Sequence, residues 1–179
     1  MIGSPLSAAQ ALYDPSHAEL RGGYFIGVPL PYLPLRIFPE RGTSNLNLEL
    51  VLPKRWRAAP AHDWLLPRLN VGTTVNLGGR TSFLYGGGLW TYDYTARGFV
   101  ELSVGGMVHN GQLTGSDPQL ARLGCRALYA LGLNLGYRPG VVSSLMLSFE
   151  HGSNGRHYLS ECPINQGLDL LGIRFAYRL

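Results

Sequence analysis

The feature that most constrains this fold is an alternation of apolar and polar residues that recurs along most of the chain. Between residues 43 and 53, leucines at the even positions 46 to 52 alternate with Asn45, Asn47 and Glu49. Successive side chains of a β-strand point to opposite faces, so a period of two predicts strands. No stretch shows a convincing helical period, and we therefore predict an all-β fold.

Eight segments of the chain are strand-like, and turn-rich connections separate them. They span residues 22–35, 43–53, 69–77, 81–92, 98–110, 123–138, 141–153 and 167–179. The first is the weakest, because prolines interrupt it. We expect these strands to form one barrel domain over residues 21–179. Residues 1–20 are expected to be an N-terminal tail or the remnant of an export segment, with an A-x-A-like pattern at Ala9–Ala11.

The composition indicates which face of the strands points outward. Charged residues make up 15% of the chain, below the roughly 25% that is usual for soluble domains. A soluble, lipocalin-like barrel needs a charged exterior, and it remains the main alternative. An apolar exterior with small polar residues inside is typical of an eight-stranded antiparallel transmembrane β-barrel of the outer-membrane type. The charges on the polar faces have both signs and are expected to pair in the lumen: Glu49, Glu101, Glu150, Arg126, Arg174 and Arg178.

The sequence gives little support for a transmembrane helix or for a nucleic-acid partner. No apolar run reaches the roughly 18 residues that a transmembrane helix needs. The net charge is +4, but the longest basic cluster is Lys54–Arg57, so we expect no nucleic-acid partner. Arginines fall in the connections expected at the outer rim, where lipid phosphates or solvent would meet them: Arg36, Arg41, Arg80, Arg122 and Arg156. Aromatic residues fall near the inner rim, as in an interfacial belt: Trp90, Tyr92, Tyr94, Phe99, Tyr137, Phe175 and Tyr177.

The sequence FEHGSNG, residues 149–155, contains the candidate chemistry. His151 and Ser153 lie two residues apart and therefore share the outward face of one strand, whereas Glu150 faces the lumen. On the next strand Asp169 has the outward register and is expected to lie level with His151 or Ser153. A carboxylate on a lipid-facing register is costly, so this convergence favours a Ser–His–Asp arrangement. The alternative is that all three are interfacial polar residues at strand ends.

FEHGSNG followed by INQGLD resembles the signature of the PagL-type lipid A 3-O-deacylases, which are eight-stranded outer-membrane barrels. The stretches RGGYFIGV, NLNLELVLP, RLNVGTTVNLGG, LYGGGLW and GGMVHNGQL also read like that family. The resemblance implies an integral protein of the bacterial outer membrane, with lipid A of lipopolysaccharide as its substrate and an ester hydrolase activity. An esterase for phospholipid or another acylated lipid is one alternative, and a non-catalytic structural barrel is another.

The resemblance also implies roles for single residues. Ser153 corresponds to the nucleophile and His151 to the general base, while Asp169 stands where the family usually has a glutamate that orients the histidine. The segment before Asn165 is longer than the resemblance implies, and it contains Glu161 as an alternative acid. Asn165 matches the asparagine that stabilises the oxyanion. The residues expected to help as positioning or oxyanion groups are Asn154 and the N–H of Gly155, and the candidate substrate contacts are Leu147, Phe149 and Arg156.

Cys125 and Cys162 both fall on the outer side of the expected barrel. A disulfide between them would hold the longer last connection over the site, and two unpaired thiols are the alternative. No cluster of metal ligands is apparent in the sequence, so we expect neither a metal nor a cofactor. The sequence leaves the oligomeric state open, a homodimer included.

Overall fold

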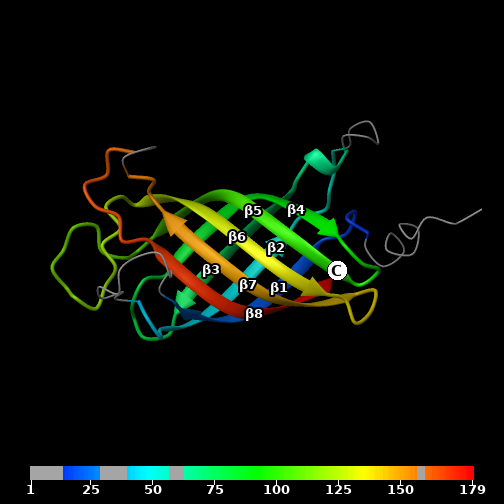
Figure 1. The fold of residues 1–179 in the computed structure, drawn as a ribbon, viewed down its shortest axis with the longest axis horizontal. Coiled ribbons are helices and arrows are strands. Elements are labelled where there is room, and N and C mark those ends of the chain that lie inside the picture. The colour runs from blue at the N-terminus through cyan, green and yellow to red at the C-terminus, as the bar shows by residue number, and fades with distance from the viewer. Residues whose placement is uncertain (1–13, 29–39, 57–62, 157–159) are drawn as a thin grey trace, which may run out of the picture.

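The computed structural model describes residues 14–28, 40–56, 63–156 and 160–179. Eight antiparallel strands follow one another in chain order and close into a barrel, which confirms the predicted fold class (Figure 1). The strands are β1 (Glu19–Gly27), β2 (Ser44–Val51), β3 (Arg68–Asn76), β4 (Phe83–Asp93), β5 (Gly98–His109), β6 (Ala127–Tyr137), β7 (Ser143–Ser153) and β8 (Leu168–Arg178). A 3₁₀ turn, η1 (Asp63–Leu65), lies in the connection between β2 and β3.

Two strand boundaries differ from the alternation pattern. β1 begins at Glu19 and ends at Gly27, whereas the pattern predicted 22–35. Residues 29–35 lie outside the described residues, as do Arg36 and Ala9–Ala11. β6 begins at Ala127 rather than at residue 123, because the preceding segment turns over the mouth of the barrel and buries the Leu123 side chain completely.

The two ends of the barrel differ. The start of β1 and the end of β8 pair at one end, which we call the inner end, together with the connections 52–67, 94–97 and 138–142. The opposite, outer end has the connections 28–43, 77–82, 110–126 and 154–167. Figure 1 shows the connections 110–126 and 154–167 projecting together at the left-hand, outer end.

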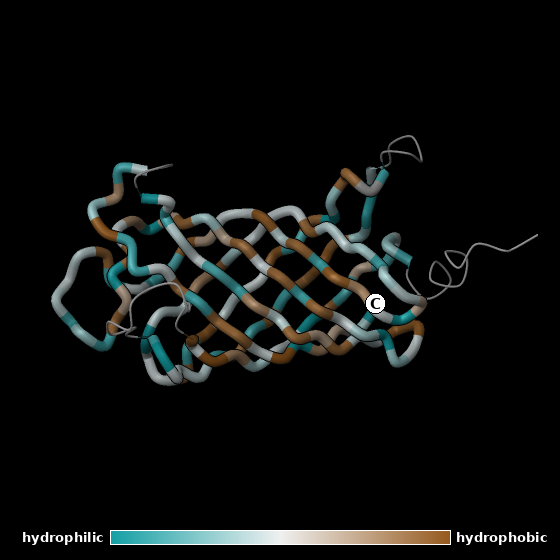
Figure 2. Tube along the Cα trace, in the orientation of Figure 1, coloured by the Kyte–Doolittle hydropathy of each residue, from teal (hydrophilic) through white to brown (hydrophobic). Residues whose placement is uncertain are grey.

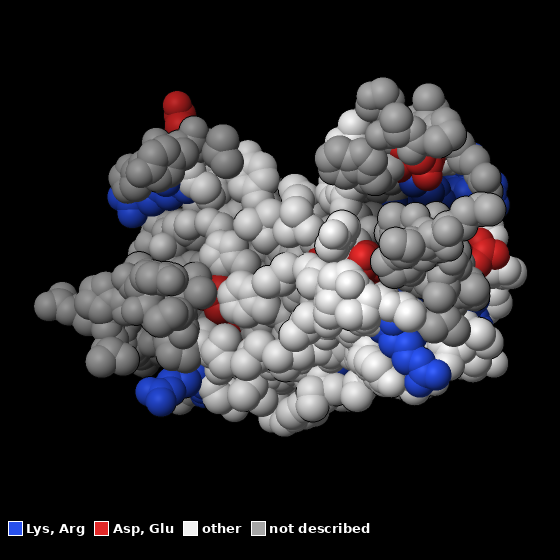
Figure 3. All heavy atoms as spheres, turned by 45° about the vertical axis from the view of Figure 1, so that its right-hand side comes forward, with Lys and Arg blue, Asp and Glu red and all other residues white. Residues whose placement is uncertain are grey.

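The outer wall of the barrel is apolar. Along each strand the exposed positions alternate with buried ones, and large apolar side chains such as Leu48, Leu133 and Ile173 are half exposed or more. Figure 2 shows apolar and polar residues alternating along the tube, and in Figure 3 the visible arginines and lysines lie toward the two ends of the molecule. Such a wall is stable in lipid rather than in water, so the strands cross a membrane. Within the described residues, no helix is long and apolar enough to cross a membrane.

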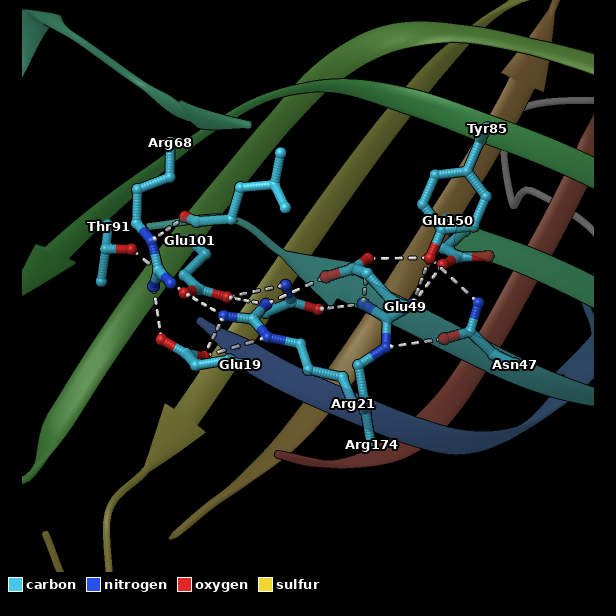
Figure 4. Close-up of polar contacts among 12 residues, drawn as sticks. Glu19, Arg21, Asn47, Glu49, Arg68, Tyr85, Thr91, Glu101, Glu150 and Arg174 are labelled. Carbon is cyan, nitrogen blue, oxygen red and sulfur yellow. Dashed lines mark hydrogen bonds and ion pairs between the residues drawn. The ribbon is translucent and has the colours of Figure 1, made fainter. Parts of the chain in front are cut away.

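The lumen holds a network of buried ion pairs, drawn in Figure 4. Arg21 binds the Glu101 carboxylate through two nitrogens, at 2.8 and 2.9 Å, and also reaches Glu19 and Glu49. Arg174 pairs with Glu150 and lies 3.5 Å from Glu49. We call these six side chains the lumen network. Buried charges are tolerated only when they are paired in this way, which explains why both signs occur on the inward faces.

Apolar side chains fill the lumen on both sides of this network. Toward the outer end the buried cluster comprises Phe25, Phe83, Tyr85, Met107, Ala121, Leu123, Leu128, Leu168 and Leu170. Phe99 lies in a smaller inner cluster, so its assignment to the aromatic belt was wrong. It faces the lumen, where the Arg138 guanidinium stacks 4.1 Å from its ring centre. Arg126 was also misassigned, since it is exposed and donates to the backbone carbonyls of His109 and Gly111 rather than to a lumen carboxylate.

Candidate active site

A histidine and a carboxylate meet on the outer wall of the barrel, at the outer ends of β7 and β8. His151 and Asp169 are direct partners in the antiparallel register of these strands. The Nδ1 atom of His151 lies 2.6 Å from Oδ1 of Asp169. The Asp169 side chain is 2% exposed and the His151 side chain 25% exposed. A carboxylate accepts a hydrogen bond from Nδ1–H, and in the neutral imidazole this tautomer leaves the lone pair on Nε2.

Ser153 lies on the same outward face of β7 as His151, about 7 Å further along the strand. Its hydroxyl oxygen accepts hydrogen bonds from Nδ2 of Asn165, at 2.7 Å, and from the backbone N–H of Gly155, at 3.2 Å. No hydrogen bond joins Ser153 to His151 within the described part of the chain. Both side chains nevertheless border the same lipid-facing surface, so a change of side-chain rotamer or a bound substrate can bring them together.

The backbone around the two side chains is fixed by glycines. Gly152, between His151 and Ser153, points into the lumen, where a Cβ would lie 2.9 Å from the sulfur of Met107. Gly167, just before β8, has a φ of 71°, and a Cβ added there would lie 3.8 Å from Cε1 of His151. A larger residue at Gly167 would therefore strain the backbone beside His151, whereas at Gly152 the flexible end of Met107 would have to shift.

A turn orients the amide of Asn165. The N–H of Gly167 donates to Oδ1 of Asn165 at 3.2 Å, so the amide oxygen faces its own turn and the nitrogen faces Ser153. Asn165 is the only described side chain that donates a hydrogen bond to Ser153. Together with the N–H of Gly155, it places two donors on the serine hydroxyl.

Asn154 follows Ser153 in the sequence, but its side-chain amide points away from the serine and bonds to the backbone of the outer connections. Its side chain is 1% exposed, and Nδ2 donates to the carbonyls of Leu123 and Ile164 at 2.8 and 2.7 Å. Its Oδ1 accepts the N–H of Arg156 at 2.9 Å. With both amide protons engaged, Asn154 joins the connections 110–126 and 154–167 to each other and is not available to an oxyanion.

Further contacts strengthen this junction between the two outer connections. Cys125 and Cys162 form a disulfide, with their Cα atoms 5.8 Å apart. The N–H of Arg122 donates to the side chain of Gln166 at 2.6 Å, and the N–H of Gln166 donates back to the Arg122 carbonyl at 3.0 Å. We call the disulfide, the Arg122–Gln166 pair and the Asn154 contacts the loop bracket. It holds the segment that carries Asn165.

The remaining candidate residues surround this centre. Leu147 and Phe149 lie below His151 on the outward face of β7, and Leu147 is 52% exposed. Arg156 and Glu161 are exposed in the connection 154–167. The described contacts of His151 involve Asp169 and not Glu161. Among the described residues, no group of three or more His, Cys, Asp or Glu side chains is arranged to hold a metal ion.

The roles of Asn154 and of the Arg122–Gln166 pair were not visible in the sequence. The contacts of Asn154 with Leu123 span 31 residues along the chain, and those of Arg122 with Gln166 span 44. Such contacts depend on how two irregular connections fold over each other, for which alternation gives no signal. The one hint was the pair of cysteines, which lie in these same connections.

Comparisons with known proteins agree with the barrel fold and identify a family. The family model described as lipid A 3-O-deacylase (PagL) matches residues 45–178, well over half of the chain. The crystal structure of the outer membrane enzyme PagL is similar, with a TM-score of 0.61 and 15% identity, over 90% of this chain and 99% of that one. A de novo designed transmembrane β-barrel has a TM-score of 0.56 and 15% identity, over 93% and 98%. No curated protein sequence matches the chain.

Proposed function

Because this chain belongs to the PagL family of lipid A 3-O-deacylases, we propose that it hydrolyses the 3-O-linked acyl ester of lipid A as a serine esterase. Membership of this family, together with the barrel fold, makes it an integral protein of the outer membrane. The observation that supports the serine mechanism best is the partly buried His151–Asp169 hydrogen bond on the lipid-facing wall, beside a serine whose hydroxyl accepts two N–H donors.

The first half of the reaction transfers the acyl chain to the enzyme. Ser153 Oγ attacks the ester carbonyl while His151 Nε2 takes its proton, and Asp169 stabilises the imidazolium that forms. The carbonyl oxygen becomes an oxyanion, which the N–H groups of Asn165 and Gly155 stabilise, each by about 3 kcal/mol. The tetrahedral intermediate then collapses, and His151 returns the proton to the departing sugar oxygen.

The second half releases the acyl chain. A water molecule attacks the acyl-serine, again with His151 as the base, and the same two donors stabilise the second oxyanion. The products are a free hydroxy fatty acid and lipid A with a free 3-hydroxyl group. Asp169 supports this cycle better than Glu161, because it is paired with His151 across β7 and β8 while Glu161 is exposed.

The position of the centre on the barrel wall suits a lipid substrate. The acyl chain would lie along Leu147 and Phe149 without leaving the membrane, and the sugar head group would lie at the outer end near Arg156. Arginine binds phosphate groups well because its planar fork donates two parallel hydrogen bonds. The same placement explains why the site needs no pocket inside the barrel.

Mass spectrometry of lipid A after incubation with the purified protein tests this proposal. We expect lipid A to lose one hydroxyacyl chain, and fragmentation to assign the loss to the 3-position. Ser153→Ala, run in parallel, should leave the lipid intact. Unchanged lipid A with the native protein would refute the proposal, and hydrolysis confined to added phospholipid would assign the esterase to a different lipid.

A further inference from the structure

A second feature of the outer end lies away from the catalytic centre. It is a cleft of about 500 Å³ at the outer ends of β2 and β3, between three of the outer connections. Arg41 and Arg80 line it from two different connections, and Gln119 lines it from a third. Thr43 and Ser44 also line it, with their hydroxyls bonded to the Glu40 carbonyl and to the Tyr24 hydroxyl. The cleft therefore brings two arginines and the Gln119 amide to one place.

Buried polar contacts hold the backbone on both sides of the cleft. The carboxylate of Glu40, which is 1% exposed, accepts the hydroxyl of Thr81 at 2.7 Å and the N–H of Ala121 at 3.4 Å. Glu40 directly precedes Arg41, so these bonds fix the start of that side of the cleft. On the other side, Asn76 Oδ1 accepts the N–H of Arg80 at 2.9 Å.

The lower edge of the cleft faces the membrane. Leu77 lines the cleft and is 56% exposed on the lipid-facing wall, where Leu46 and Val75 continue the apolar surface. A ligand in the cleft would thus have anionic groups against Arg41 and Arg80 and apolar groups against Leu77. Bidentate hydrogen bonds from arginine suit phosphate oxygens. This combination fits a phosphorylated lipid of the outer leaflet.

The cleft is separate from the candidate active site. In the closed order of eight strands, β3 lies four strands from β7 in either direction. The packed barrel stands between the two sites, so a lipid held in the cleft is not the molecule being hydrolysed at Ser153. We propose that this cleft is a second lipid-binding site, which holds the phosphate groups of a lipid A molecule in the outer leaflet. The inference rests on the outer-membrane setting of the proposed function but not on catalysis.

Native mass spectrometry of the delipidated Ser153→Ala protein tests this site without turnover. We expect the protein to bind bisphosphorylated lipid A more tightly than phosphate-free lipid A with the same acyl chains. Adding Arg41→Ala and Arg80→Ala should weaken the phosphate-dependent binding by about tenfold or more, because each arginine contributes charge-assisted hydrogen bonds. Arg55→Ala with Arg97→Ala is the matched control, since it removes two exposed cations at the inner end.

Three results would overturn the inference. One is unchanged binding after loss of Arg41 and Arg80, in a variant whose heat-modifiable electrophoretic mobility shows a folded barrel. The second is equal affinity for phosphate-free lipid A. The third is inorganic phosphate binding as tightly as lipid A, which would make the ligand a free ion. Loss of binding in this variant, together with a native protein that fails to hydrolyse lipid A, would support the second site and refute the proposed catalysis.

Discussion

Asp169 reaches His151 although its side chain is one methylene shorter than the glutamate that the family usually has. The two residues are direct partners across β7 and β8, and their side chains share the outward face, so the shorter acid spans the gap at 2.6 Å. The Asp169 side chain is also almost fully buried, which keeps water from competing for this bond. The direct pairing of the two residues across β7 and β8 thus makes the longer glutamate side chain unnecessary.

Replacing this acid tests its role. Asp169→Asn should lower kcat for lipid A by roughly 10²- to 10⁴-fold, because the amide can donate to Nδ1 and favours the wrong tautomer of His151. Steady-state release of hydroxy fatty acid measures the effect. Glu161→Gln is the matched control and should stay within about twofold of the native rate. The opposite ranking of the two variants would make Glu161 the acid.

Two asparagines near Ser153 should differ in what they contribute. Asn165→Ala removes the proposed oxyanion donor and should lower kcat by about 10²- to 10³-fold with little change in KM or in thermal stability. Asn154→Ala breaks contacts between the two outer connections, so it should lower the temperature at which activity is lost. Measuring kcat, KM and inactivation temperature for both variants separates the roles. Equal losses of kcat without any change in inactivation temperature would contradict this division.

At the scale of elements, the loop bracket connects two irregular segments that the strands alone do not position. The disulfide closes a loop of 37 residues, for which the loss of chain entropy corresponds to about 2–4 kcal/mol. Because this loop contains β6 and β7, Cys125→Ser with Cys162→Ser should unfold at a lower temperature than the oxidised protein. The double variant should lose activity at a temperature lower still, because the connection that carries Asn165 is released first. Native protein treated with a reducing agent should behave like the double variant.

Activity after heating, compared with heat-modifiable mobility, checks this prediction. If activity is lost at a lower temperature than the one at which the barrel unfolds, the loop bracket stabilises the outer connections separately from the barrel. An inactivation temperature that is the same with and without the disulfide would show that hydrogen bonds from Asn154 and Gln166 suffice to hold the segment.

The elements also show what the sequence could predict. Seven strands followed from alternation, because lipid on one side and a packed lumen on the other impose a period of two. β1 was misplaced, since the prediction assigned residues 1–20 to a tail and began the strand at residue 22, whereas the strand already includes Glu19 and Arg21, which pair in the lumen. Parity predicted that His151 and Asp169 share the outward face, and it left Asp169 level with either His151 or Ser153. The register pairs it with His151. The contacts of Asn154 could not be predicted in this way, because they join segments without a regular period.

At the scale of the whole molecule, the barrel has an apolar exterior and holds its charges inside. The lumen network links β1, β2, β5, β7 and β8, so it ties together strands that are not neighbours in the sheet. The arginines at its centre, Arg21 and Arg174, are 1% and 3% exposed. Removing one partner from such a pair leaves a charge buried and unpaired, which is more costly than removing both.

Arg174→Met should therefore destabilise the barrel by about 3–5 kcal/mol, mainly by leaving Glu150 without its cation. Arg174→Met with Glu150→Leu should recover a large part of this loss. Denaturant unfolding in lipid vesicles, followed by tryptophan fluorescence, gives both free energies of unfolding. A double variant less stable than the single variant would contradict the assignment of the cost to the stranded carboxylate.

The central claim is that Ser153 is a nucleophile activated by His151 and Asp169 on the lipid-facing wall. The most direct measurement is intact-protein and peptide mass spectrometry after treatment with a long-chain fluorophosphonate, which modifies activated serines covalently. The account predicts one adduct, on the peptide that contains Ser153, and its loss in His151→Ala. A protein that stays unmodified, or an adduct on another serine, would contradict it.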